Sequence, residues 1–241
     1  MFSPELFEPF VNALLAKNRL LNLMSKGTDA HTLMYQHVYD SVHIAEYMDF
    51  NAVSRLLDIG SGGGLPGVPL AIMFPELHVT LVDSVEKKMR AVKEIAEKIG
   101  LTNINTFSMR AEALGHDPVF REAYDIVTAR AVSALPTLLE YALPFVKVGG
   151  HFIAYKGSEY EKELNVSLTA LQKLGGSFER AITYDLPDGK GHHVYLIFKK
   201  TCSTPREYPR RVGMPEKRPL KQLWRTGNFL VQSGTYEFTT H

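Results

Sequence analysis

Residues 55–67 read RLLDIGSGGGLPG, a short apolar stretch that leads directly into a glycine-rich turn. The apolar part, Arg55 to Ile59, predicts a buried strand, and Pro66 begins a predicted helix that ends near Phe74, because proline suits the first turn of a helix. Glycines at such a turn allow unusual backbone angles and let a ligand approach the main-chain N–H groups. In an α/β sheet this position is the crevice beyond the carboxyl end of the strand, and we expect a carboxylate or phosphate at the helix N-terminus.

Strands and helices alternate along the chain after this turn, which is typical of a parallel sheet covered by helices. The further predicted strands are Leu77–Val82, Asn103–Phe107, Tyr124–Thr128 and, after a turn at Gly149-Gly150, His151–Tyr155. The further predicted helices run from a cap at Ser84 to Ile99, from Leu135 to Leu143 and from Glu159 to Leu174. The last predicted strands, Ser177–Tyr184 and His193–Phe198, are separated only by the turn-forming residues 186–191. The sequence therefore predicts an α/β, Rossmann-like fold whose mostly parallel seven-stranded sheet ends in an antiparallel hairpin.

The first fifty residues have a helical pattern and precede this sheet. Apolar residues recur at helical spacing between Leu6 and Leu15, and a second helix is predicted from about Asp29 to Tyr47. We therefore expect three parts: an N-terminal helical extension over residues 1–50, the α/β domain over 51–200 and a basic C-terminal tail over 201–241.

The composition argues against several classes of protein. The single cysteine, Cys202, excludes an intrachain disulfide and a cysteine metal cluster. Glu5 and Glu8 interrupt the N-terminal apolar stretch, which is therefore expected to be neither a secretory signal nor a membrane span. We expect a monomer located in the cytoplasm, with no membrane partner and no bound metal.

The charge of the chain is unevenly distributed, although its formal net value is only +1. Residues 199–225 carry nine basic and two acidic side chains, which leaves 18 basic and 24 acidic side chains in the rest of the chain. The nine basic residues are Lys199, Lys200, Arg206, Arg210, Arg211, Lys217, Arg218, Lys221 and Arg225. A basic segment on an acidic body predicts contact with a polyanion such as RNA.

Asp83 closes the second predicted strand, 23 residues after Gly60. A carboxylate at this position accepts hydrogen bonds from ribose hydroxyls, so the glycines and Asp83 together predict a nucleoside-containing cofactor. One alternative is a dinucleotide, because residues 62–67 match Gly-x-Gly-x-x-Gly. The long glycine loop, the terminal hairpin and the lack of a separate substrate domain favour a methyl donor without phosphate. A tight turn with a capping aspartate and no ligand is the other alternative.

Several segments resemble the RsmG (GidB) family of bacterial methyltransferases, which modify guanine N7 in 16S ribosomal RNA. The similar segments are residues 37–41 (HVYDS), 56–72 (LLDIGSGGGLPGVPLAI), 110–112 (RAE), 129–131 (ARA), 155–157 (YKG) and 208–220 (YPRRVGMPEKRPL). The resemblance covers roughly residues 10–220, and Leu65-Pro66-Gly67 and the basic tail are its most specific parts.

The resemblance implies a class I methyltransferase fold, S-adenosyl-L-methionine as cofactor, and 16S ribosomal RNA or the small ribosomal subunit as partner. The expected cofactor-binding residues are Gly60, Gly62, Leu65, Asp83, Ser84, Val85, Ala111, Glu112 and Arg130. A small-molecule methyltransferase of the same fold and an NAD-binding protein remain as alternatives.

Arg130 is also the first candidate for positioning the substrate, because it follows the fourth strand at the mouth of the crevice. Lys156 could meet a phosphate, and His37 and Asp40 lie at helical spacing where they could pack the N-terminal helices over the crevice. His192 and His193 resemble a metal pair, but neighbours on a strand point to opposite faces, so we expect no metal there. Guanine N7 carries a lone pair, so its methylation needs no general base.

Overall fold

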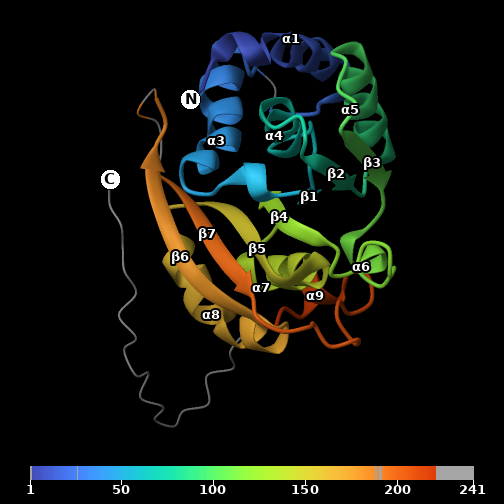
Figure 1. The fold of residues 1–241 in the computed structure, drawn as a ribbon, viewed down its shortest axis with the longest axis vertical. Coiled ribbons are helices and arrows are strands. Elements are labelled where there is room, and N and C mark those ends of the chain that lie inside the picture. Colours follow the sequence, from blue (N-terminus) through green and yellow to red (C-terminus); the bar gives the residue numbers. More distant parts are fainter. Residues whose placement is uncertain (1, 26, 188, 190–191, 221–241) are drawn as a thin grey trace.

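The structure, a computed structural model, describes residues 2–25, 27–187, 189 and 192–220. Its seven strands form one sheet in the order β3-β2-β1-β4-β5-β7-β6. Strands β1 to β5 are parallel, and β7 lies antiparallel between β5 and β6 (Figure 1). The predicted mostly parallel sheet with a terminal antiparallel hairpin is confirmed.

The strands agree closely with the predicted segments. They are β1 Arg55–Ile59, β2 His78–Asp83, β3 Ile104–Ser108, β4 Tyr124–Arg130, β5 Val146–Gly157, β6 Gly176–Asp185 and β7 His192–Lys200. The fifth strand begins five residues earlier than predicted, and Gly149-Gly150 lies inside it rather than in a turn before it. Gly149 has a φ of +87°, and the β4–β5 register shifts between Tyr124 and Ile126, so the glycines form an irregularity within a paired strand.

Helices cover both faces of the sheet (Figure 1). The main helices are α1 Pro4–Leu21, α4 Gly67–Met73, α5 Glu86–Lys98, α6 Ala111–Leu114, α7 Leu135–Ala142, α8 Tyr160–Lys173 and α9 Met214–Lys217. Two short 3-10 turns, η3 Phe50–Ala52 and η4 Leu143–Phe145, precede β1 and β5. One apolar cluster joins α1, α4 and α5 to the sheet, and a second joins α7 and α8 to the opposite face. Because the N-terminal helices share a core with the sheet, the three-part division of the chain stays a prediction. In the part of the chain that the structure describes, no helix is long and apolar enough to cross a membrane.

The predicted cap of α5 is wrong. Ser84 is exposed, the helix begins at Glu86, and Val85 is the residue before it.

The second predicted helix is also wrong as a single regular helix. Residues 30–46 instead form α2 Ala30–Thr32, a π-helical turn η1 Leu33–Val38, α3 Tyr39–Val42 and a 3-10 turn η2 His43–Glu46. Side chains bind several carbonyls in the second half of this segment. The His37 carbonyl accepts hydrogen bonds from the side chains of Ser41 (2.6 Å) and Arg130 (3.2 Å), and tyrosine hydroxyls donate to the carbonyls of Asp40 and Ser41. The departure from a regular α-helix therefore occurs where the segment is bonded to the sheet.

The C-terminal segment, residues 201–220, packs against the body rather than extending as a tail. Arg121 donates hydrogen bonds to the carbonyls of Thr204 (2.7 Å), Pro205 (3.1 Å) and Tyr208 (2.8 Å). Lys200 is fully buried and donates to the Leu143 carbonyl. Lys221 and Arg225, which we counted in the basic tail, lie outside the described residues. The described part of the predicted basic tail, residues 201–220, is therefore packed on the body, and the boundary of the tail stays a prediction.

Candidate functional site

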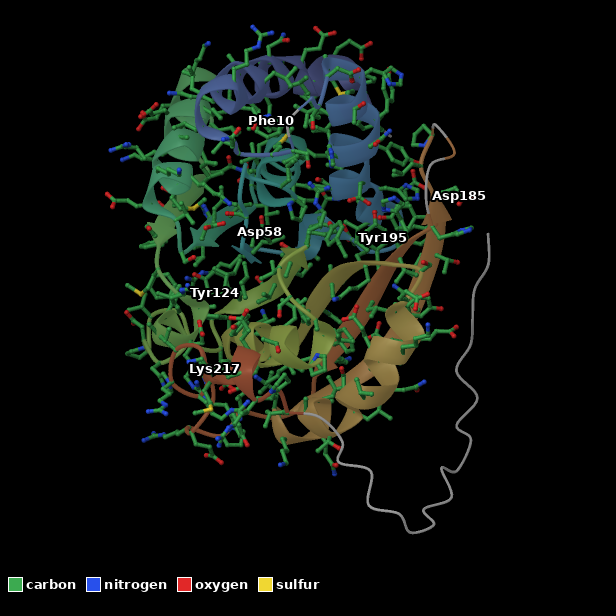
Figure 2. All side chains as sticks on the ribbon, turned by 180° about the vertical axis from the view of Figure 1, so that it is seen from behind. Phe10, Asp58, Tyr124, Asp185, Tyr195 and Lys217 are labelled. Carbon is green, nitrogen blue, oxygen red and sulfur yellow. The ribbon has the colours of Figure 1, made fainter. Side chains whose placement is uncertain are left out.

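The glycine-rich turn is anchored from below by Asp58, a fully buried residue of β1 (labelled in Figure 2). Its carboxylate accepts hydrogen bonds from the Gly67 N–H (3.1 Å) and the Thr128 hydroxyl (3.0 Å). A Cβ at position 67 would lie 2.2 Å from the Leu81 side chain, so only glycine lets α4 begin this close to the sheet. Burial raises the pKa of Asp58 to about 7, although the bonds from Thr128 and Gly67 oppose this shift.

This arrangement leaves no donor for a bound anion at the start of α4. The Gly67 N–H bonds to Asp58, the Val68 N–H bonds to the Gly64 carbonyl (2.7 Å), and Pro66 and Pro69 have no N–H. The expectation of a carboxylate or phosphate ligand at this helix N-terminus is wrong, because a carboxylate of the protein itself lies there.

Asp83 lies at the end of β2 and faces the glycine turn. Its carboxylate accepts the Gly62 N–H at 3.1 Å through one oxygen and the Val85 N–H at 2.9 Å through the other. Each oxygen keeps further acceptor capacity for a ligand. Asp83 therefore shapes the glycine turn as well as presenting a carboxylate to the crevice.

A smaller cavity of about 310 Å³ opens beyond the ends of β1, β2 and β3. Its walls consist of Ile59, Gly60, Val82, Asp83, Ser84, Lys88, Met109, Arg110, Ala111, Glu112, Ala131, Val132, Ser133, Tyr141 and Glu216. Three carboxylates and two cations face this space, so its wall is acidic on balance. Gly60, Asp83, Ser84, Ala111 and Glu112, all predicted from the sequence, come together here.

A larger cavity of about 710 Å³ lies on the other side of the glycine turn and shares Gly60, Lys88, Ala131 and Ser133 with the smaller one. A Cβ on Gly60 would lie 2.5 Å from the Val132 side chain, so the loops after β1 and β4 touch at this boundary. Ala131 has a φ of +55°, a conformation that alanine rarely adopts. Such strained residues gather at functional sites, and Ala131 borders both cavities.

The remaining predicted cofactor residues do not line the smaller cavity. Gly62, Leu65 and Arg130 line the larger cavity only. Val85 lines neither cavity and contacts the site through its bond to Asp83.

Arg130 belongs to a buried polar network under the larger cavity. Its guanidinium donates to Asp40 at 2.8 Å, and the Asp40 carboxylate also bonds to the Tyr184 hydroxyl and to His193 Nδ1 (3.2 Å). Burial of Asp40 would raise its pKa, but the bond from His193 and the charge of Arg130 outweigh this and hold the pKa below its usual value. Asp40 is thus ionised, and Arg130 is fixed in the cavity wall with 16% of its side chain exposed.

Three tyrosines complete this network, and the sequence analysis did not identify them. Hydroxyls on β5, β6 and β7 point to the same short helix: Tyr155 donates to the Ser41 carbonyl (2.9 Å), Tyr184 to the Asp40 carboxylate, and Tyr195 to the Asp40 carbonyl (2.8 Å). The rings of Tyr184 and Tyr195 stack with centroids 4.3 Å apart. No local pattern identifies them, since each partner is at least 114 residues away in the sequence.

The other candidates lie around the same cavity. His37 lines it, and burial followed by the charge of Arg130 lowers its pKa to about 4, so the ring is neutral at pH 7. Lys156 donates to Glu163 (2.8 Å) and to the Ser133 carbonyl (2.9 Å), which ties it to the protein rather than leaving it for a phosphate. His193 Nδ1 lies 3.2 Å from the Asp40 carboxylate and His192 Nδ1 lies 4.0 Å from that of Asp185, and the described residues contain no cluster of three metal-ligating side chains.

Glu112 was predicted only as a cofactor residue, but it also holds the C-terminal segment. Its Oε1 accepts the Gly213 N–H at 2.9 Å, and Glu112 is 3% exposed. The C-terminal segment therefore reaches the wall of the smaller cavity, a contact that sequence reasoning missed because 101 residues separate the two positions.

Comparison with known proteins identifies a family of methyltransferases. Residues 4–184 match the family model described as rRNA small subunit methyltransferase G. A protein named ribosomal RNA small subunit methyltransferase G from Brevibacillus brevis is 40% identical over 216 residues, which is 90% of both chains. Its namesake from Staphylococcus epidermidis is 42% identical over 216 residues, again 90% of both chains.

Solved structures share the fold at low sequence identity. A putative O-methyltransferase from Klebsiella pneumoniae superposes with a TM-score of 0.57 at 13% identity, covering 81% of this chain and 91% of that one. A SAM-dependent O-methyltransferase from Thermotoga maritima superposes with a TM-score of 0.51 at 17% identity, covering 69% and 66%. These similarities show the Rossmann-like methyltransferase fold.

Proposed function

The chain belongs to the rRNA small subunit methyltransferase G family, and we propose that it transfers a methyl group from S-adenosyl-L-methionine to N7 of a guanine in 16S ribosomal RNA. The observation that carries this proposal is the pair of cavities that meet at Gly60 and Ala131. One is shaped and charged for a nucleoside without phosphate, and the other is large enough for a base.

The smaller cavity fits the adenosine part of the cofactor. Asp83 has acceptor capacity for ribose hydroxyls, while Ser84 and Ala111 form the wall where the base extends beyond β2 and β3. The acidic balance of the wall suits a positively charged sulfonium compound and opposes a pyrophosphate, as does the closed N-terminus of α4. These features favour S-adenosyl-L-methionine over the NAD alternative.

The methionine part of the cofactor is expected to extend past Gly60, where the two cavities meet, toward Gly62 and Leu65 in the wall of the larger cavity. When bound, S-adenosyl-L-methionine supplies a methyl group on a positively charged sulfur. The residues of the chain contribute orientation: Asp58 fixes the glycine turn from below, and the contact of Gly60 with Val132 fixes the two loops relative to each other.

The larger cavity is the proposed site of the guanine. Arg130 is held by Asp40 in the cavity wall, so its role is to position the base or a neighbouring phosphate. Guanine N7 attacks through its own lone pair, and no residue has to remove a proton first. The neutral state of His37 adds no positive charge to a site where a cationic product forms.

The RNA partner is supported by exposed cations next to the site. Arg206, Arg211, Lys217 and Arg218 are exposed on the C-terminal segment, whereas Lys200 is buried and Arg210 is paired with Glu140. A small-molecule methyltransferase has no use for such a surface, so RNA or the small ribosomal subunit is the favoured substrate. We place this activity in the cytoplasm and expect the monomer to act.

The decisive experiment supplies purified protein and S-adenosyl-L-methionine to 16S RNA and to small subunits from cells that lack the gene. We expect one new 7-methylguanine, mapped by mass spectrometry of nuclease fragments. Methylation of small molecules but of neither RNA substrate would contradict the proposal. Tight NAD binding without any response to S-adenosylhomocysteine would contradict the cofactor.

A further inference from the structure

The C-terminal segment contributes one side chain to the smaller cavity. Among the described residues that form its wall, all others precede residue 142, and Glu216 alone comes from α9, at the end of the described chain. This cavity is the proposed adenosine site, so the inference below rests on the proposed function.

Two hydrogen bonds fix the position of Glu216. Upstream, the Gly213 N–H donates to Glu112 at 2.9 Å, and Gly213 has a φ of +77°, which favours glycine at this turn into α9. The preceding residue, Pro215, is buried, and its carbonyl accepts a hydrogen bond from the Thr137 hydroxyl at 3.1 Å. The backbone of Glu216 is therefore attached to both α6 and α7.

Glu216 lies in the cavity wall together with Glu112 and Tyr141, and the charges of both glutamates act on the Tyr141 hydroxyl. Burial, followed by the negative charges of Glu112 and Glu216, raises the pKa of Tyr141 to about 12, so its hydroxyl remains protonated. One oxygen of Glu112 is already occupied by Gly213. Glu216, by contrast, is an exposed carboxylate for which the described residues provide no hydrogen-bond partner, and it borders a cavity.

The order of residues in the cavity places Glu216 toward the base. With the ribose at Asp83, at the end of β2, the adenine extends past the end of β3, where Ala111 and Glu112 begin α6. Glu112 holds Gly213, three residues before Glu216, at this same end. The outer edge of adenine carries an exocyclic amine, a donor, and an ionised carboxylate can only accept.

We propose that Glu216 accepts a hydrogen bond from the exocyclic amine of the cofactor adenine, so that the C-terminal segment supplies a residue that selects adenine. The position of this segment on the body then determines whether Glu216 can reach the cofactor. Without the segment, the wall of the adenine end is open on this side.

The test compares the affinity of two ligands by calorimetry: S-adenosylhomocysteine and its inosine analogue, in which a 6-oxo group replaces the 6-amino group. For the unmodified protein we expect at least about tenfold preference for S-adenosylhomocysteine, equal to about 1.4 kcal/mol. In Glu216→Ala this preference should fall at least about threefold, and in Glu216→Lys it should reverse, because an ammonium donates to the 6-oxo group. Glu207→Ala, an exposed glutamate of the same segment outside the cavity wall, is the matched control.

Thermal melting checks that the variants fold, which is expected because Glu216 is exposed. An equal preference in Glu216→Ala and the unmodified protein would overturn the inference while leaving the proposed function intact. Failure of the unmodified protein to bind either ligand would instead overturn the proposed cofactor, and the inference with it.

Discussion

Arg210 and Glu140 form a two-point ion pair although 70 residues separate them in the chain. Arg210 Nε and Nη2 donate at 2.9 Å and 2.7 Å, and the backbone N–H of Arg210 adds a third bond at 2.8 Å. The Glu140 side chain is completely buried in α7, whereas a quarter of the Arg210 side chain is exposed. This pair attaches the C-terminal segment to the body, so Arg210, like the buried Lys200, is a basic residue with a structural role.

Loss of this pair should destabilise the protein. Arg210→Ala leaves the Glu140 carboxylate buried with no cation, which should lower the free energy of unfolding by about 3–5 kcal/mol. Urea denaturation measures this change. The neighbouring exposed Arg211 is the matched control, and Arg211→Ala should stay within about 0.5 kcal/mol of the unmodified protein. Equal effects at both positions would contradict the structural role of Arg210.

Salt-sensitive RNA binding should depend on the exposed cations of the segment and not on Arg210. Replacing Arg206, Arg211, Lys217 and Arg218 by glutamine should reduce the slope of log affinity against log salt by up to about 3 units, since each phosphate contact contributes about 0.7–0.9. The binding titration uses 16S RNA at several salt concentrations. Lys93→Gln with Lys98→Gln, two exposed positions of α5 that line neither cavity, is the control and should leave the slope almost unchanged. An unaltered slope in the fourfold variant would place the RNA contact elsewhere.

Asp83→Ala should weaken binding of S-adenosylhomocysteine by about 1–3 kcal/mol, because a charge-assisted hydrogen bond to the ribose is lost. The substitution also frees the Gly62 and Val85 N–H groups, which loosens the glycine turn. Calorimetry measures the affinity. Glu86→Ala, an exposed residue in the first turn of α5, serves as the control. Unchanged affinity in Asp83→Ala would refute the ribose contact.

Arg130→Ala should slow methyl transfer by about 100-fold or more, because the substrate loses a group that orients it. Its effect on S-adenosylhomocysteine affinity should be smaller than that of Asp83→Ala, since Arg130 does not line the cavity proposed for adenosine. Arg130→Lys keeps the charge but not the planar donor, so an intermediate rate is expected. Single-turnover kinetics separate these effects from binding, and a fully active Arg130→Ala variant would exclude the residue from the site.

Asp58 should make folding stability fall as the pH rises from about 4 to about 7. Its pKa is raised to about 7 in the folded state, while an aspartate in the unfolded chain ionises with its ordinary pKa of 3.8. Between these values the folded state retains a proton that the unfolded state has lost, so raising the pH favours unfolding; above about 7 the effect is complete.

Asp58→Asn, which can still accept from Gly67 and donate to the Thr128 hydroxyl, should remove this contribution. Urea denaturation from pH 4 to 8 should therefore show the variant gaining stability relative to the unmodified protein as the pH rises. Parallel pH profiles for the two proteins would show that Asp58 is ionised throughout.

The sequence by itself determined the order of strands and helices, the hairpin at the end and the position of the cofactor turn. These features follow from short-range causes: apolar periodicity, the glycines at 60–67 and an acid at the end of the second strand. That is why β1 was predicted residue for residue, and why Gly60, Asp83 and Ala111 were correctly expected to lie together at the ends of neighbouring strands.

Only the tertiary structure decided which charges are paired and which remain exposed. Asp40 meets Arg130 across 90 residues and Tyr184 across 144, and the segment that carries Asp40 departs from the regular helix predicted over residues 29–47. Charge counting along the chain identified the basic segment, but it cannot show that Glu140 and Glu112 bind this segment to the body. Long-range burial sets these outcomes, because the free energy of a charge depends on what surrounds it in space and not on its neighbours in sequence.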